Sequence, residues 1–247
     1  MDILRNGIVL GWYDFFLAYR RTFLGPIWQS LQIALWSAGL VFVFGTIYEE
    51  IGAYVAYLVP GLAVWNCLSN TVTQGTSVFT SRASIILNLP AGLMLHVVRL
   101  TTTTLIRFTF QLAVFIPIVV YFNLWPEVLW GHALLGTLFL AALIAPVIVV
   151  VGILNAYQRD LEQLISVVMR FMFFLTPVFW MPAEGSFQMR FVDWNPFFYP
   201  LTIVRSPLLG ESVALQDWAL GLTGFLVLTG CATTMFALSA KRLPTWL

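Results

Sequence analysis

Charged residues are scarce in this 247-residue chain, in which Asp, Glu, Lys and Arg together account for 9% of the positions. A soluble domain carries roughly 25% charged residues because its surface faces water. Hydrophobic residues make up 60% of the chain and the mean hydropathy is +0.89, so the apolar surplus has to face lipid. The composition argues against a soluble enzyme and a disordered protein, and the net charge of +1 argues against a nucleic-acid binder.

Cysteine, lysine and histidine are equally rare. Cys67 and Cys231 lie in apolar stretches, which predicts buried thiols and no disulfide framework. Lys241 is the only lysine and no glycine stands among the ten residues directly before it, so the chain has no phosphate-binding loop of the G-x-x-x-x-G-K-[ST] type. His96 and His132 are assigned to opposite membrane faces and cannot share a metal. We therefore expect no bound cofactor or metal and no enzymatic activity of this chain.

Carboxylates are missing from the middle of the apolar stretches. All 11 acidic residues fall at the ends of these stretches or between them. Proton- or sodium-coupled carriers usually keep buried carboxylates as relays. Membrane enzymes that handle metal-bound diphosphates need clustered aspartates. Both classes are disfavoured, and a membrane-embedded enzyme of lipid or glycan synthesis remains the less favoured alternative.

Long apolar runs are what the sequence has instead. A spanning helix needs about 20 largely apolar residues, whereas barrel strands need only about 10 alternating ones. Six runs are long enough for helices, and they cover residues 27–48, 54–78, 97–122, 131–154, 162–181 and 218–239. We predict an all-α integral membrane protein in which residues 1–247 form one transmembrane domain with six spans.

Two further segments are neither spans nor simple loops. Residues 1–25 are rich in aromatics and end near two arginines, which predicts an amphipathic helix along the inner membrane interface. Residues 183–217 are also aromatic, but three prolines break any spanning helix there. We expect this second segment to form short re-entrant helices at the outer face, as an outer gate.

Basic residues orient the spans. With both termini in the cytoplasm, eight basic residues lie inside or at the inner edge and two lie outside, in agreement with the positive-inside rule. The inner residues are Arg5, Arg20, Arg21, Arg82, Arg99, Arg159, Lys241 and Arg242, and the outer ones are Arg190 and Arg205. An even number of spans agrees with this arrangement.

Polar side chains recur inside the spans at helical spacing. The third span carries His96, Arg99, Thr103, Arg107 and Gln111 on one face. A cation as deep as Arg107 has to face protein or water. Similar stripes occupy the second and fifth spans, and they comprise Asn66, Asn70, Thr73 and Ser77, and Gln163, Ser166 and Arg170. A lined pathway and interhelical hydrogen bonding both explain such stripes, and both remain open.

Tryptophans stand beside these polar groups. Trp28 and Trp36 share a face of the first span, and Trp65 is next to Asn66. An aromatic face suits the apolar face of a sugar ring, and ordinary packing is the competing interpretation. The candidate substrate path therefore comprises Trp28, Trp36, Trp65, Asn66, Asn70, Arg107 and Arg170.

Several motifs, in order along the chain, resemble permease subunits of ABC polysaccharide exporters. Residues 14–28, D-F-F-L-A-Y-R-R-T-F-L-G-P-I-W, resemble the start of that family's first span. Arg159-Asp160-Leu161, followed by F-L-T-P-V-F-W at residues 174–180, is similar to the family's R-D-[LIV] loop and fifth span. Asn195-Pro196 with Arg205 resembles its outer segment, and I-L-N-L-P at residues 86–90 lies where its first cytoplasmic loop meets the ATPase.

The resemblance implies the membrane subunit of an ATP-driven exporter in the bacterial cytoplasmic (inner) membrane. Two copies would form a pore, and two separate ABC ATPase subunits would bind ATP and Mg²⁺. The substrate would be a polysaccharide such as O-antigen, capsule or teichoic acid, carried on undecaprenyl diphosphate. Exporters of drugs and small lipids share this architecture and remain the alternative.

The resemblance also implies roles for three groups of residues. The lipid diphosphate would meet Arg5, Arg20 and Arg21. Coupling to the ATPase would involve Arg82, Asn88, Leu89, Pro90, Arg159 and Asp160. The outer gate would comprise Asn195, Pro196, Phe197, Tyr199 and Arg205.

Overall fold

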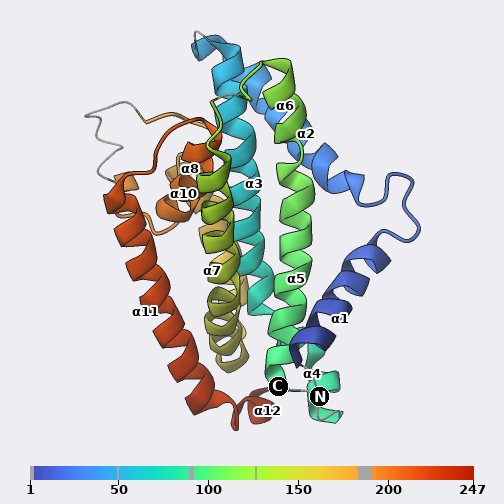
Figure 1. The fold of residues 1–247 in the computed structure, drawn as a ribbon. Helices are drawn as coiled ribbons and strands as arrows, with labels where there is room; N and C mark the ends of the chain where they lie inside the picture. Colours follow the sequence, from blue (N-terminus) through green and yellow to red (C-terminus); the bar gives the residue numbers. More distant parts are fainter. Residues whose placement is uncertain (1–2, 49, 89–91, 126, 183–190) are drawn as a thin grey trace.

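The computed structural model describes residues 3–48, 50–88, 92–125, 127–182 and 191–247, and these ranges contain helices and loops but no strand. Figure 1 shows the arrangement. The α-helices are α1 (Ile3–Ala18), α2 (Ile27–Phe44), α3 (Ile51–Thr76), α4 (Ala83–Asn88), α5 (Leu93–Leu112), α6 (Phe115–Tyr121), α7 (Trp130–Tyr157), α8 (Leu161–Leu175), α10 (Phe198–Leu208), α11 (Leu215–Ser239) and α12 (Leu243–Trp246). Two short 3-10 turns, η1 (Gly45–Ile47) and η2 (Thr80–Arg82), follow α2 and precede α4.

Five of the helical segments are long and apolar enough to cross a membrane. They are Ile27–Ile47, Ile51–Thr76, Leu93–Tyr121, Trp130–Tyr157 and Leu215–Ser239. They match five of the six predicted spans, and the all-helical membrane fold is confirmed.

The predicted fifth span, residues 162–181, is shorter in the structure. Helix α8 has 15 residues and ends at Leu175, and Thr176 has an extended backbone. The residue before a proline is driven out of the helical region, and Pro177 follows directly. The run of apolar residues continues, but the helix does not.

The predicted third span, residues 97–122, is interrupted at Ala113 and Val114, between α5 and α6. Pro117 has no N–H to offer the carbonyl of Ala113, and a proline ring crowds the carbonyl four residues earlier. A single proline therefore divides one apolar run into two helices.

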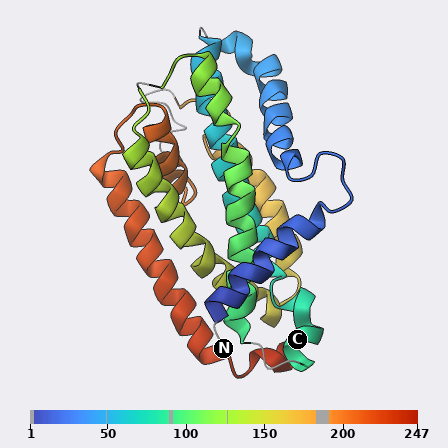
Figure 2. The same cartoon turned by 45° about the vertical axis from the view of Figure 1, so that its right-hand side comes forward.

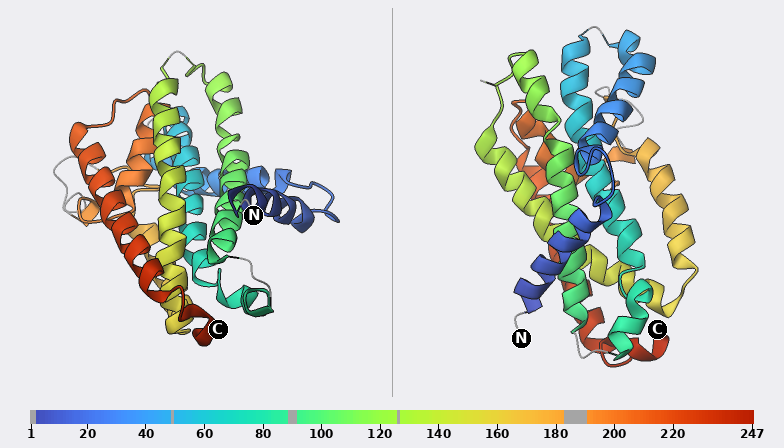
Figure 3. Two further views of the ribbon diagram at one scale, coloured as in Figure 1. Left: turned by 60° about the horizontal axis from the view of Figure 1, so that its bottom comes forward. Right: turned by 90° about the vertical axis from the view of Figure 1, so that its right-hand side faces the viewer.

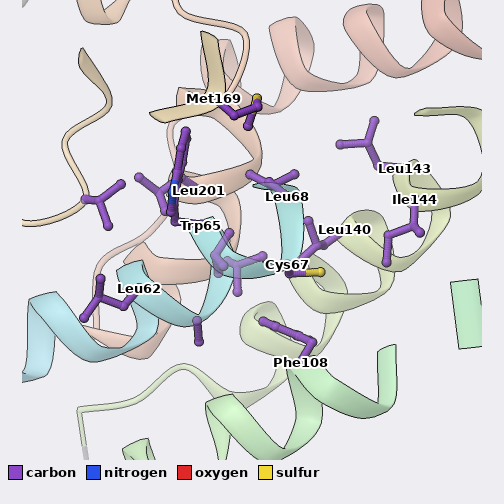
Figure 4. Packing of buried hydrophobic residues seen from close by; sticks show 14 of the residues in the cluster. Leu62, Trp65, Cys67, Leu68, Phe108, Leu140, Leu143, Ile144, Met169 and Leu201 are labelled. Carbon is purple, nitrogen blue, oxygen red and sulfur yellow. The ribbon is translucent and has the colours of Figure 1, made fainter. Parts of the chain in front are cut away.

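Helix α3 is the central element. It packs against α2, α5, α7, α8 and α10 (Figure 2), and its buried side chains include Leu58, Val59 and Ala63. Glycines let α3 approach α7 closely, because a β-carbon on Gly75 would lie 2.7 Å from Val151 Cγ2. Small residues at helix contacts are typical of membrane bundles, in which packing drives association. Figure 4 shows the core around Leu68, Leu140 and Ile144.

The predicted interfacial segment, residues 1–25, forms α1, which packs along α5 (Figure 3). Gly7 and Gly11 face α5, and a β-carbon on Gly11 would lie 2.5 Å from the carbonyl oxygen of Arg99. The side of α1 that faces away from α5 carries large exposed apolar side chains such as Val9, Trp12 and Phe16. The position of α1 at the inner membrane interface remains a prediction.

Of the predicted outer segment, residues 183–217, the structure describes residues 191–217, which contain α10 and the start of α11, and residues 183–190 lie outside the description. Leu201, Ile203 and Val204 on α10 are fully buried against the bundle. Helix α10 contacts α3, α7 and α11. At the other end of the molecule, the C-terminal helix α12 contacts α4 (Figure 1).

Candidate functional site

A groove of about 700 Å³ lies between α2, α3 and α8. It brings together four residues of the predicted substrate path, Trp36, Trp65, Asn66 and Arg170, from these three helices. Its remaining lining comprises Leu40, Phe44, Leu62, Ser69, Thr73, Ser166, Met169, Phe173, Phe174 and Phe179. The groove therefore combines aromatic faces with amide, hydroxyl and guanidinium groups.

The two groove tryptophans are held differently. Trp36 is 58% exposed, whereas Trp65 is 5% exposed. The ring of Trp65 lies 5.7 Å from that of Phe197 and 5.9 Å from that of Phe173, and Figure 4 shows it packed beside Leu201. Trp36 can meet a bound molecule directly, while Trp65 presents only an edge.

Trp28 lies outside this groove. It lines a separate hollow of about 290 Å³ together with Gln29, Gln32, Leu35 and Trp36. Trp36 belongs to both concavities, so the two are neighbours along α2. The predicted pairing of Trp28 and Trp36 on one helical face is confirmed by this shared lining.

Arg107 and Asn70 do not line the groove. The guanidinium of Arg107 donates to Gln74 Oε1 at 2.8 Å, and the Gln74 amide donates to Asn70 Oδ1 at 3.4 Å. On the same face of α5, Gln111 donates to Gln29 of α2 at 2.9 Å. Interhelical hydrogen bonds thus occupy much of this polar stripe.

The fifth-span motif at residues 174–180 and the outer-gate residues Asn195 and Arg205 are joined by hydrogen bonds. The Asn195 amide donates to Thr176 Oγ1 at 2.8 Å, and its Oδ1 accepts from the backbone N–H of Phe197. The Arg205 guanidinium donates to the carbonyl oxygen of Pro177 at 2.6 Å. Asn195 and Arg205 are 7% and 5% exposed, so these gate candidates are buried supports for the turn after α8.

Tyr57 of α3 completes this support. Its ring lies 3.8 Å from the Arg205 guanidinium carbon, a cation–π contact. Its hydroxyl is 2.9 Å from the Pro177 carbonyl oxygen and 3.0 Å from that of Trp180. The other gate candidates are more open, since Pro196 is exposed and Phe197 is half-buried. Tyr199 donates to the Asp193 carbonyl oxygen at 2.6 Å.

The model of the ABC-2 type transporter membrane domain matches residues 6–209, most of the chain. The chain belongs to the ABC-2 type transporter family. Three curated relatives are O-antigen export system permease proteins named RfbA. The Myxococcus xanthus protein is 24% identical over 163 residues, which cover 65% of this chain and 62% of that relative. Two Klebsiella pneumoniae proteins are 23% and 25% identical over 197 residues, or 74% of this chain and 72% of each relative.

At the opposite end of this ABC-2 chain, Asp14 joins three elements. Its carboxylate accepts hydrogen bonds from Arg99 of α5 and is 3.3 Å from the Arg82 guanidinium of η2. Burial raises the pKa of Asp14, but the hydrogen bonds and charge of Arg99, followed by those of Arg82, outweigh burial and hold the pKa below 3.8. Arg82, a coupling candidate, therefore lies in an ionic clasp between α1 and α5.

The remaining candidates at this end of the permease are solvent-exposed. Arg5, Arg20 and Arg21 are exposed and make no ion pair within the described ranges. Asn88 donates to the Ser84 carbonyl oxygen at 2.7 Å, whereas Leu89 and Pro90 lie outside the described residues.

Arg159 and Asp160 form the turn that begins α8. Arg159 donates to the Leu247 carbonyl oxygen at 3.2 Å. Asp160 precedes α8 and makes no side-chain capping bond. Arg159 thereby contacts the residue that follows the C-terminal helix α12, and α12 also contacts α4.

Two supporting residues of the permease, Asp14 and Tyr57, were not predicted from the sequence. Asp14 stood inside the first motif and Tyr57 inside the second apolar run, but nothing in the linear sequence indicates their partners. Asp14 is 68 residues from Arg82 and 85 residues from Arg99 along the chain. Tyr57 is 120 residues from Pro177 along the chain, and only the fold brings them together.

Proposed function

We propose that two copies of this permease form the path by which a lipid-linked polysaccharide crosses the cytoplasmic membrane, driven by two copies of a separate ABC ATPase. The observation that carries the proposal is the groove between α2, α3 and α8, which exposes Trp36 beside Asn66 and Arg170. Stacking faces with hydroxyl and amide groups suit sugar rings. Many weak contacts let a polymer slide, whereas one strong site would stall it.

The groove is open on one side, which supports pairing. In α2 only Ile33 and Ser37 are buried, and in α8 only Met169 is buried. The other faces of these helices carry large exposed apolar side chains, including Leu35, Val167 and Phe171. A second copy placed against α2 and α8 would cover these faces and close two grooves into one channel.

The chain crosses the membrane six times if α8 and the turn after it form the fifth crossing. Both termini then lie in the cytoplasm, and α10 belongs to the outer gate. The free cations Arg5, Arg20 and Arg21 stand at the inner interface, where a lipid diphosphate arrives. The names of the O-antigen export relatives support a glycan substrate over a drug or a small lipid.

The ATPase would dock at the end that carries α4 and α12. Arg82, Asn88, Arg159 and Asp160 all belong to this end, and α12 contacts both α4 and α7. The clasp formed by Asp14, Arg82 and Arg99 would carry a movement of this region to α1 and α5. ATP and Mg²⁺ would be held by the partner, which supplies the hydrolysis.

Deletion of the gene tests the proposal. Cells without the permease should lack the surface polysaccharide and accumulate the lipid-linked polymer inside. Trp36→Ala should slow export, and Trp36→Phe should reduce the export rate only slightly. Trp125→Ala, in an outer loop, is the matched control and should leave the export rate unchanged. Normal surface polysaccharide in the deletion strain would refute the glycan proposal and favour small-molecule export.

A further inference from the structure

A second cavity, of about 530 Å³, lies at the outer end of the molecule. It is enclosed by the start of α3, the loop between α6 and α7, the segment after α8, and α10. Its lining comprises Ala53, Ala56, Tyr57, Leu124, Glu127, Met181, Pro182, Phe198, Thr202, Arg205, Ser206, Leu208, Leu209 and Glu211. This volume falls within the range of small-molecule sites, which is about 300–1,000 Å³.

The polar groups on the floor of this outer cavity are already engaged. Arg205 donates to the Pro177 carbonyl oxygen and lies over the Tyr57 ring. The Tyr57 hydroxyl reaches two carbonyl oxygens. These contacts fix both side chains in the floor of the cavity.

The polar groups on the walls and rim are not engaged. Glu127 and Glu211 are exposed, and neither carboxylate has an ion pair or hydrogen bond within the described residues. The hydroxyl of Ser206 likewise has no partner there, and the buried Thr202 Oγ1 lacks one too. Groups that can accept hydrogen bonds thus outnumber their donors around an apolar, partly aromatic wall.

Such a lining matches a ligand with many hydroxyl donors and an apolar face. Resting on the proposed function, we propose that the outer cavity binds one sugar unit of the emerging glycan and selects neutral or amine-bearing sugars over acidic ones. Glu127 and Glu211 would accept from sugar hydroxyls or an ammonium group, and Phe198 would cover the ring. The described lining carries two carboxylates, Glu127 and Glu211, against one cation, Arg205 on the floor, so its net charge is negative and a third carboxylate from an acidic sugar would be repelled.

A divalent metal ion fits these residues less well. Only two carboxylates line a cavity of about 530 Å³, and in the described part of the chain no three His, Cys, Asp or Glu residues gather as a metal site. Metal ions prefer compact sets of ligands. A sugar unit fills the volume, and a metal ion does not.

Saturation-transfer NMR on the purified permease in detergent tests this inference with glucose, glucosamine and glucuronate, three sugars with the same ring size. Glucose and glucosamine should bind, and glucuronate should bind about fivefold more weakly or not at all. The double variant Glu127→Gln/Glu211→Gln should bind glucuronate as well as glucose. Glu162→Gln, an exposed glutamate on α8 at the other end of the chain, is the matched control. Melting temperatures should be unchanged, because all three glutamates are exposed.

Equal binding of the three sugars by the parent protein, or unchanged selectivity in the double variant, would overturn the inference. Competition by Ca²⁺ at micromolar concentration would overturn it in favour of a metal site. The result is separable from the proposed function. If gene deletion removes the surface glycan but the purified permease binds no sugar, only the proposed sugar site is refuted. If the permease binds sugar but the deletion strain has normal surface glycan, only the export role is refuted.

Discussion

Buried polar residues stabilise the turn that follows α8. Arg205 and Asn195 were assigned to an outer gate from the sequence motifs, and the structure buries both against the turn that ends α8. The motifs located the residues, but the linear sequence could not indicate that they bind the Thr176-Pro177 motif. Their partners depend on how α10 folds back onto α3.

Replacement of Arg205 by Met should lower the stability of the purified permease by about 1–3 kcal/mol, because the Pro177 carbonyl loses a charged donor and Tyr57 loses its cation–π partner. Arg205→Lys should be intermediate, since an ammonium cannot reproduce the planar guanidinium. The melting temperature in detergent measures this. Arg170→Met, at an exposed position, is the control, and an equal shift in both variants would contradict the buried role.

The Arg99 and Arg82 guanidinium groups hold the pKa of Asp14 below its ordinary value, so its carboxylate is charged in the folded protein at neutral pH. The stability that the clasp contributes is therefore present above the ordinary pKa of an aspartate and is lost as the pH falls through the lowered pKa of the folded state. We expect α1 to stay on α5 from pH 8 to pH 5. In Asp14→Asn, α1 should separate from α5 over the same pH range.

A cysteine at Thr102 reports this separation, because Thr102 lies under Gly11 of α1. In a Cys231→Ser background, maleimide labelling of Thr102→Cys should be slow with Asp14 present and several-fold faster in Asp14→Asn. If the labelling rate rises as the pH is lowered from 8 to 5 in the protein that keeps Asp14, a group other than Asp14 holds α1 against α5.

Helix positions were largely predictable, and helix ends were not. Continuous apolar runs identified five of the long segments, since lipid imposes their length. The exceptions arise at prolines, where Pro177 ends α8 early and Pro117 divides the third run. The predicted polar stripes were real, but sequence could not separate the groove residues Asn66 and Arg170 from residues such as Arg107 that bind a neighbouring helix.

The close contact of α1 with α5 depends on Gly11. Gly11→Leu should displace α1, because its β-carbon would meet the Arg99 carbonyl oxygen at 2.5 Å and a backbone atom cannot yield. Gly230→Leu on α11, where nothing lies within 4 Å, is the control. Hydrogen exchange should quicken about tenfold or more across Ile3–Ala18 in the first variant only, since an isolated helix of this length is marginal. Unchanged exchange in Gly11→Leu would show that α1 does not depend on this contact.

The whole molecule has two ends of different character. The end with α4 and α12 carries most of the basic residues, while Glu127 and Glu211 lie at the other. With both termini inside, cysteines at Glu127 and Glu211 should react with an impermeant maleimide in intact spheroplasts, and one at Arg159 should not. Reaction at Arg159 from outside would reverse the orientation.

In the proposed function, the groove between α2, α3 and α8 pairs with the same groove of a second copy, and the two together form the path of a glycan. Reconstitution into liposomes with the partner ATPase and a fluorescent lipid-linked oligosaccharide tests it most directly. We expect ATP-dependent transfer of the oligosaccharide that requires both subunits. Trp36→Ala should slow this transfer while ATP hydrolysis continues. ATP hydrolysis without oligosaccharide transfer, or transfer at an unchanged rate in Trp36→Ala, would contradict it.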